Sequence, residues 1–107
     1  MNLKRGDNMI VLYKGDTFTK NIVLENYELQ PTDTLLVGIK KRITDTEYLL
    51  PVLRLTNLKT QFEYTSEQTD SIQPDTYILE IKLLYANNKI ATLKQEELQV
   101  KGVVIDE

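Results

Sequence analysis

Cysteine and histidine are both absent from this sequence. Without cysteine, no disulfide can link parts of the fold, and no thiolate can act as a nucleophile or a metal ligand. Without histidine, the chain lacks the side chain best suited to proton transfer near neutral pH and the commonest metal ligand. Zinc, iron–sulfur and haem sites lose their usual ligands, so we expect no cofactor.

Glycine and serine are scarce, which removes further catalytic motifs. The four glycines form neither Gly-x-Gly-x-x-Gly nor a P-loop. The two serines, Ser66 and Ser71, lie outside any Gly-x-Ser-x-Gly elbow and have no histidine to pair with. The carboxylates of Asp33, Asp45 and Glu47 do not have calcium-loop spacing, and we interpret them as solvated turn residues. These absences predict a protein that is not an enzyme.

Long apolar runs and a basic surface are missing as well. The longest apolar stretches, 9–13 and 35–37, fall far short of the roughly 20 residues that a membrane helix needs. The formal net charge is −3, which argues against nucleic acid or anionic lipid as a partner. Residues 1–7 lack the apolar stretch of a secretory signal. We expect a soluble chain made in the cytoplasm, forming one domain over residues 1–107.

Alternating apolar and polar residues dominate the chain and predict β-strands with one buried face. The long candidates are 17–25, 34–43 and 76–85. In 34–43 the expected core face ends with Ile43, while Lys40 and Arg42 point to solvent. The expected core side chains of 76–85 are Tyr77, Leu79, Ile81, Leu83 and Tyr85, with Glu80 and Lys82 on the solvated face.

Shorter strands and turns fill the remaining sequence. The candidates are 9–13, 48–55, 61–64, 89–94 and 98–105. Pro51 cannot donate to a ladder, so 48–55 is predicted to be an edge strand or to break there. Asn87-Asn88 suits a two-residue hairpin, and Gly102 suggests a bulge.

One short helical turn is predicted at Ser66–Ser71. Thr65 can cap its start, with Gln68 as the reciprocal partner, and Pro74 prevents its continuation. About seven or eight short strands separated by turns are typical of an all-β, antiparallel β-sandwich.

Candidate contact residues come from apolar side chains at positions that a core does not require. Ile78 and Leu84 lie on the second face of 76–85, where a second sheet edge or another subunit could cover them. Tyr13, Tyr27 and Tyr48 are less constrained than the other tyrosines and could belong to a binding surface. Packing in the core is the alternative interpretation for each tyrosine.

Five segments, in this order, carry a resemblance to a known family. They are GDTF at 15–18, DTLLVGIKK at 33–41, FEYTSEQTD at 62–70, PDTYILEIK at 74–82 and KIATL at 89–93. This order resembles small structural proteins of tailed bacteriophages and prophages, and the immunoglobulin-like N-terminal module of phage baseplate upper proteins. The matched positions mark turns and core residues, so the resemblance implies no site residue.

The resemblance implies an immunoglobulin-like β-sandwich that acts as a structural or adaptor module of a phage tail or baseplate. Its partners would be other virion or assembly proteins, or further copies of itself in a homo-oligomer. Such a protein would be made in the cytoplasm of a bacterial host and incorporated into the virion. The alternatives are an independent carbohydrate- or peptide-binding module, which requires a cluster of exposed tyrosines, and a hydrolase that uses only carboxylates.

Overall fold

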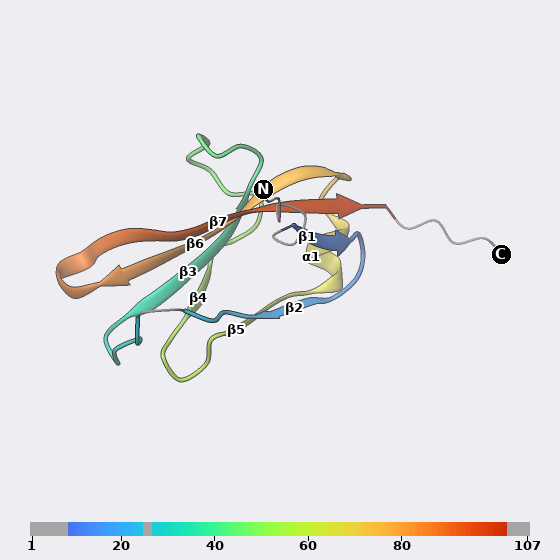
Figure 1. Ribbon diagram of the computed structural model, residues 1–107. Helices are drawn as coiled ribbons and strands as arrows, with labels where there is room; N and C mark the ends of the chain where they lie inside the picture. The colour runs from blue at the N-terminus through green and yellow to red at the C-terminus, as the bar shows by residue number, and fades with distance from the viewer. Residues whose placement is uncertain (1–8, 25–26, 103–107) are drawn as a thin grey trace, which may run out of the picture.

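The structure, a computed structural model, describes residues 9–24 and 27–102 (Figure 1). Strands make up most of its regular structure. The elements are β1 (Ile10–Tyr13), β2 (Phe18–Asn21), β3 (Thr34–Lys40), β4 (Leu53–Leu55), β5 (Gln61–Tyr64), α1 (Ser66–Asp70), β6 (Asp75–Tyr85), the 3-10 turn η2 (Ala86–Asn88) and β7 (Lys89–Lys101). The predicted all-β class with one short helix is confirmed.

The strands form two sheets. Five strands pair in the order β1-β7-β6-β3-β4, and β2 pairs with β5 in a second sheet, which lies below the first in Figure 1. β1 runs parallel to β7, whereas every other pair is antiparallel. The parallel pair departs from the purely antiparallel arrangement that was predicted. β1 does not pair with β2, the next strand in the sequence, but lies at the edge of the five-stranded sheet beside β7.

Side chains from both sheets meet in one hydrophobic core. Its buried apolar residues are Leu12, Ile22, Leu35, Val37, Ile39, Leu50, Phe62, Tyr64, Ile72, Tyr77, Leu79, Ile81, Leu83, Leu98 and Val100. Phe62 contacts Phe18 and Tyr64 edge-on, with ring centroids 6.0 and 5.8 Å apart. Burying one large apolar side chain contributes about 1.5–3 kcal/mol, so this core supplies the main stabilisation. The predicted core face of β6 is confirmed.

The end of β3 differs from the prediction. β3 stops at Lys40 rather than continuing to residue 43, and Ile43 is 51 % exposed instead of facing the core. Lys40, predicted to point to solvent, is buried. The reason is that the chain leaves the sheet after Lys40 and folds back across it, so the expected solvent side of β3 is covered.

The C-terminal strands also differ. Segments 89–94 and 98–101 form one strand, β7, with a register shift opposite Ile81 and Lys82 that leaves Leu93 without a partner in the ladder. The hairpin loop has three residues rather than two, and Asn88 adopts positive φ (62°). Gly102 follows the strand and makes no bulge in it. Residues 103–105 of the predicted last strand lie outside the described residues.

Local sequence signals place the helix and the edge strand as predicted. Thr65 caps α1, and its side chain and that of Gln68 exchange the reciprocal hydrogen bonds of a capping box. Within α1, Thr69 is fully buried and bonds to the turn after β1, accepting from Gly15 N and donating to the carbonyl of Asp16. β4 is an edge strand that begins after Pro51, as the missing N–H predicts.

Candidate functional site

The candidate site lies on the outer face, which we define as the side of the five-stranded sheet that points away from β2 and β5. Cross-strand register assigns the residues to this face. They include Arg54 of β4; Leu36, Gly38 and Lys40 of β3; Ile78, Glu80, Lys82 and Leu84 of β6; and Ile90, Thr92 and Gln95 of β7. In Figure 1 the β3–β4 loop (residues 41–52) rises on the side of the sheet away from β2 and β5.

The β3–β4 loop rests on the sheet through Tyr48 and Gly38. A Cβ atom at Gly38 would lie 2.5 Å from Cε1 of Tyr48 and nearer still to Cδ1, so only glycine leaves room for the ring. The backbone N–H of Leu49 donates to the carbonyl of Ile39 over 2.8 Å. These two contacts hold the second half of the loop against the end of β3.

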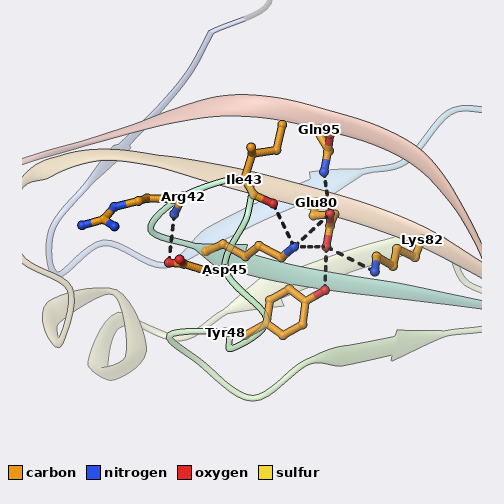
Figure 2. Close-up of polar contacts among 8 residues, drawn as sticks. Arg42, Ile43, Asp45, Tyr48, Glu80, Lys82 and Gln95 are labelled. Atoms are coloured by element: carbon orange, nitrogen blue, oxygen red, sulfur yellow. Dashed lines mark hydrogen bonds and ion pairs between the residues drawn. The ribbon is translucent and has the colours of Figure 1, made fainter.

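Glu80 is the centre of the polar contacts beneath the loop, and Figure 2 shows the side chains that converge on it. Its carboxylate accepts hydrogen bonds from Oη of Tyr48 and Nε2 of Gln95, each over 2.6 Å. Nζ of Lys40 lies 3.2 Å from both carboxylate oxygens, and Nζ of Lys82 lies 3.8 Å from Oε1. Glu80 is 2 % exposed, so this charge is nearly cut off from water but accepts hydrogen bonds from three side chains and has the ammonium group of Lys82 nearby.

The surroundings of Glu80 set the protonation states of the cluster. Burial would raise the pKa of the Glu80 carboxyl, but hydrogen bonds from Tyr48, Gln95 and Lys40 and the charge of Lys82 outweigh it and hold that pKa below its usual range. Burial and the hydrogen bond to Glu80 raise the pKa of Tyr48 to about 12. The carboxylate therefore stays charged and the phenol stays neutral near neutral pH.

This cluster is suited to holding the loop rather than to handling a substrate. Glu80 uses its carboxylate oxygens on protein donors and has almost no contact with solvent. Lys40 extends from the end of β3 and also donates to the carbonyl of Ile43 over 3.5 Å, which ties the start of the loop to the same carboxylate. Among the described residues, no group of three carboxylates is placed to hold a metal ion.

Beside the loop, the outer face carries an apolar row that the fold leaves partly open to solvent. We define the row as Leu36, Leu84 and Ile90. Leu84 pairs with Ile90 across β6 and β7, and Leu36 lies in the neighbouring cross-strand row. Ile90 is 57 % exposed, and the two leucines are half-buried.

Basic side chains flank the apolar row. Leu36 lies between Arg54 of β4 and Lys82 of β6 in the cross-strand register. Arg54 is exposed and Lys82 is half-buried. Leu36 therefore has a basic residue on each side in the register, of which Lys82 also lies 3.8 Å from the Glu80 carboxylate.

The candidate contacts Ile78 and Leu84 share the outer face but not one patch. They are six positions apart in β6, which is about 20 Å along a strand, and Glu80 and Lys82 lie between them on this face. Ile78 is half-buried beside Lys40, so burial within the chain does not exclude it as a contact. Only Leu84 belongs to the apolar row.

The structure does not bring Tyr13, Tyr27 and Tyr48 together. Tyr13 lies at the end of β1 opposite Lys101 and is 46 % exposed. Tyr27 lies in the connection before β3, at the other end of the sheet, whereas Tyr48 packs over the middle of it. The tyrosine cluster that the binding-module alternative requires is therefore absent from the described residues.

Tyr27 borders an open cleft between the β2–β3 connection and the β4–β5 turn. The cleft has a volume of about 340 Å³, and its lining residues are Ile22, Leu24, Tyr27, Glu28, Leu29, Asn57 and Thr60. Oη of Tyr27 donates to Oδ2 of Asp33 over 2.5 Å, and this bond raises the pKa of the phenol. Asp33 is 4 % exposed, so its prediction as a solvated turn carboxylate was wrong: it is buried by the turn that it closes with Gln30 N.

Sequence reasoning missed the Glu80 cluster. Alternation along each strand placed Lys40 and Glu80 on a solvated face, because it contains no information about a loop that covers this face. The available signal was Gly38 in the middle of a strand, since glycine in a strand often marks close approach of another part of the chain.

Among the described residues, no helix is long and apolar enough to cross a membrane. Comparisons of the chain with models of protein families, with curated proteins and with solved structures found no match.

Proposed function

We propose that this protein is a non-enzymatic structural or adaptor module, a component of phage or prophage tail or baseplate assembly that acts through protein–protein contacts. The observation that carries the proposal is the apolar row of Leu36, Leu84 and Ile90. It lies on the side of the sheet that the core does not use, and Ile90 is 57 % exposed. An apolar strip with a charged rim is the usual composition of a protein interface.

Strand order supports an immunoglobulin-like sandwich as the finer fold. In that fold the third, sixth and seventh strands share a sheet, and the second and fifth strands pair in the other. Here β3, β6 and β7 are neighbours, β4 adds to the edge beside β3, and β2 pairs with β5.

The proposal is tested by co-expressing the tagged chain with the products of the genes that neighbour its own. Leu84→Lys places a charge in the apolar row without entering the core, so the variant should fold but lose at least about 90 % of the co-purified partner. Glu63→Lys is the matched control, because Glu63 is exposed on the second sheet, away from the outer face. Thermal unfolding of both variants checks their folding.

A partner that binds the wild type and Glu63→Lys but not Leu84→Lys supports the proposal. The proposal is contradicted if no neighbouring gene product binds and the purified chain does not associate with itself, or if Leu84→Lys binds as well as the wild type.

The binding-module alternative as predicted needs a cluster of exposed tyrosines, which the described residues lack, so only a narrower second candidate is left: a small carbohydrate- or peptide-binding cleft beside the single Tyr27. An aromatic side chain at the edge of a concave surface is a common element of such sites. In a screen of glycans and peptides, a ligand bound by the wild type and lost in Tyr27→Ala would support this candidate. Retained binding in Tyr27→Ala would contradict it.

A further inference from the structure

We infer that β1 pairs with β1 of a second copy of this chain, antiparallel and about a two-fold axis at Val11, so that two five-stranded sheets join along this edge. The inference goes beyond the proposed function, because it uses an edge of the sheet and not the apolar row. Three features of the described residues lead to it: the direction of the backbone groups of β1, the composition of the strand, and its match to a second copy of itself.

The backbone of β1 has one side with which no described strand pairs. β1 lies at the edge of the five-stranded sheet, and its only neighbour among the described strands is β7. The N–H of Lys14 donates to the carbonyl of Lys101 over 2.8 Å. Because backbone groups alternate in direction along a strand, those of Ile10 and Leu12 also point to β7, whereas those of Val11 point to the open edge. Such edge groups are completed by another strand, so the occupant is extended backbone.

β1 lacks the charge that the other edge strands carry. Proteins commonly place charged side chains or proline on edge strands, which prevents pairing with other chains. β2 contains Lys20, β4 contains Arg54 and β5 contains Glu63. Residues 9–13, by contrast, contain no charged residue and no proline. Among the described strands, β1 is therefore the edge that is left unprotected against a further strand.

Three side chains of this segment form an exposed ridge on the outer face. Leu12 is buried in the core, so the residues at odd positions lie on the opposite side of the strand. They are Met9, Val11 and Tyr13, which are 39 %, 40 % and 46 % exposed. A strand that pairs with β1 therefore covers apolar surface as well as completing backbone hydrogen bonds.

A second copy of β1 matches this edge at every position. Antiparallel pairing about Val11 places large apolar or aromatic residues opposite one another throughout: Val11 with Val11, Ile10 with Leu12, and Met9 with Tyr13. The two copies of Val11 exchange both backbone hydrogen bonds, because the N–H and the C=O of this residue point to the edge. The contact is isologous and closes after two copies, since it leaves the charged edge strand β4 at each end of the joined sheet.

The first test measures self-association of the purified full chain, by sedimentation and light scattering, from about 1 μM to about 1 mM, the range of weak dissociation constants. We expect a monomer–dimer equilibrium. Val11→Lys places like charges opposite one another at the axis and should raise the dissociation constant by about tenfold or more. Val23→Lys is the matched control and should not change it, because Val23 is 68 % exposed and follows β2 in the other sheet. Thermal unfolding checks that both variants fold.

A second test measures the register directly. The chain contains no cysteine, so Val11→Cys introduces one thiol in each copy. In an antiparallel pair that exchanges both hydrogen bonds, opposite Cα atoms lie about 5.5 Å apart, a distance that a disulfide spans. Under mild oxidation, Val11→Cys should become a covalent dimer, whereas Val23→Cys should stay largely monomeric.

A dimer that is weakened by Val11→Lys but not by Val23→Lys, together with cross-linking at position 11, supports the inference. A monomer at all concentrations overturns it and leaves the edge to another segment of this chain or to a different protein. It is also overturned if Val11→Lys weakens the dimer no more than Val23→Lys does, or if Val11→Cys cross-links no faster than Val23→Cys.

Leu84→Lys separates this inference from the proposed function. The variant should lose the neighbouring gene product but keep the dimer, because Leu84 lies in the apolar row and not on β1. A dimer lost in Leu84→Lys and retained in Val11→Lys overturns the inference and places self-association on the apolar row. A monomeric chain that still binds its partner through Leu84 overturns the inference alone and leaves the proposed function intact.

Discussion

At the scale of single residues, Glu80 shows how a charged side chain can be placed inside a small protein. Moving a carboxylate out of water costs several kcal/mol unless charged and hydrogen-bonding partners compensate. Tyr48, Gln95 and Lys40 supply these partners within 2.6–3.2 Å. Removing any one of them would leave polar atoms buried without their bonds, so the cluster acts as a unit.

Replacement of Glu80 by glutamine tests this unit. Glu80→Gln keeps the shape of the side chain but leaves the Lys40 ammonium buried without a counter-charge. We expect the free energy of unfolding to fall by about 3 kcal/mol, the usual result of breaking a buried ion pair. Urea denaturation measures the change. The control is Glu97→Gln, because Glu97 is an exposed carboxylate on β7; its free energy of unfolding should change by less than about 0.5 kcal/mol. An equally small change in the free energy of unfolding of Glu80→Gln would show that the cluster does not stabilise the fold.

The stability of the protein should also depend on Glu80 at acid pH. The pKa of Glu80 is lower in the folded chain than its ordinary value, so the unfolded chain binds the proton more readily. The stabilisation from Glu80 is therefore present above the unfolded pKa, about 4.3, and is lost as the pH falls through the folded pKa.

Urea midpoints measured from pH 7 to pH 3 check this dependence. The wild type should lose more stability below about pH 4 than Glu80→Gln, which has no carboxyl at this position. Asp75 also has a lowered pKa, because Lys41 and the N–H of Thr76 bond to it, but both proteins share that contribution. Parallel pH profiles would contradict the role of Glu80.

At the scale of elements, the packing of the β3–β4 loop on β3 depends on a single missing side chain. Gly38→Ala would place a Cβ atom 2.5 Å from Cε1 of Tyr48, so the ring must move and its bond to Glu80 must weaken. We expect a loss of about 1–3 kcal/mol of stability, the range for overpacking in a closely packed site. Thermal or urea denaturation measures it.

Gly102→Ala is the matched control for this prediction. A Cβ atom there would lie 3.5 Å from Cγ of Pro74, an ordinary van der Waals contact, so stability should hardly change. Equal stability of Gly38→Ala and Gly102→Ala would show that the loop does not rest on β3 through Tyr48.

Elements whose signals are local were the ones that the sequence predicted well. The capping box of Thr65 and Gln68 depends only on residues three apart, and the start of β4 after Pro51 depends only on a missing N–H. The hairpin before β7 was predicted one residue too short, because Ala86 joins the turn in which Asn88 takes positive φ. Strand alternation does not specify the length of such a loop.

At the scale of the whole molecule, two sheets of unequal width leave one face of the larger sheet outside the core, and among the described residues it is the β3–β4 loop that lies on this outer face. The side chains on one side of β3 and β6 are buried in the hydrophobic core. On the other side, the loop covers Glu80 and leaves the apolar row open. Under the proposed function, assembly with a partner protein through this face would bury what folding alone leaves exposed. The partner-binding experiment with Leu84→Lys tests this.

The all-β class, the short helix with its cap, and the core face of β6 could all be predicted from the sequence, because each follows from side-chain period or from residues close together in the chain. It did not determine that β1 runs parallel to β7, that Lys40 and Glu80 are buried together, or that three candidate tyrosines lie apart. These depend on which segments meet in space, and alternation along a strand marks two faces without saying what covers either one. The fold as a whole places the loop over the middle of the outer face and leaves the row beside it partly exposed, and no pattern within one strand carries that information.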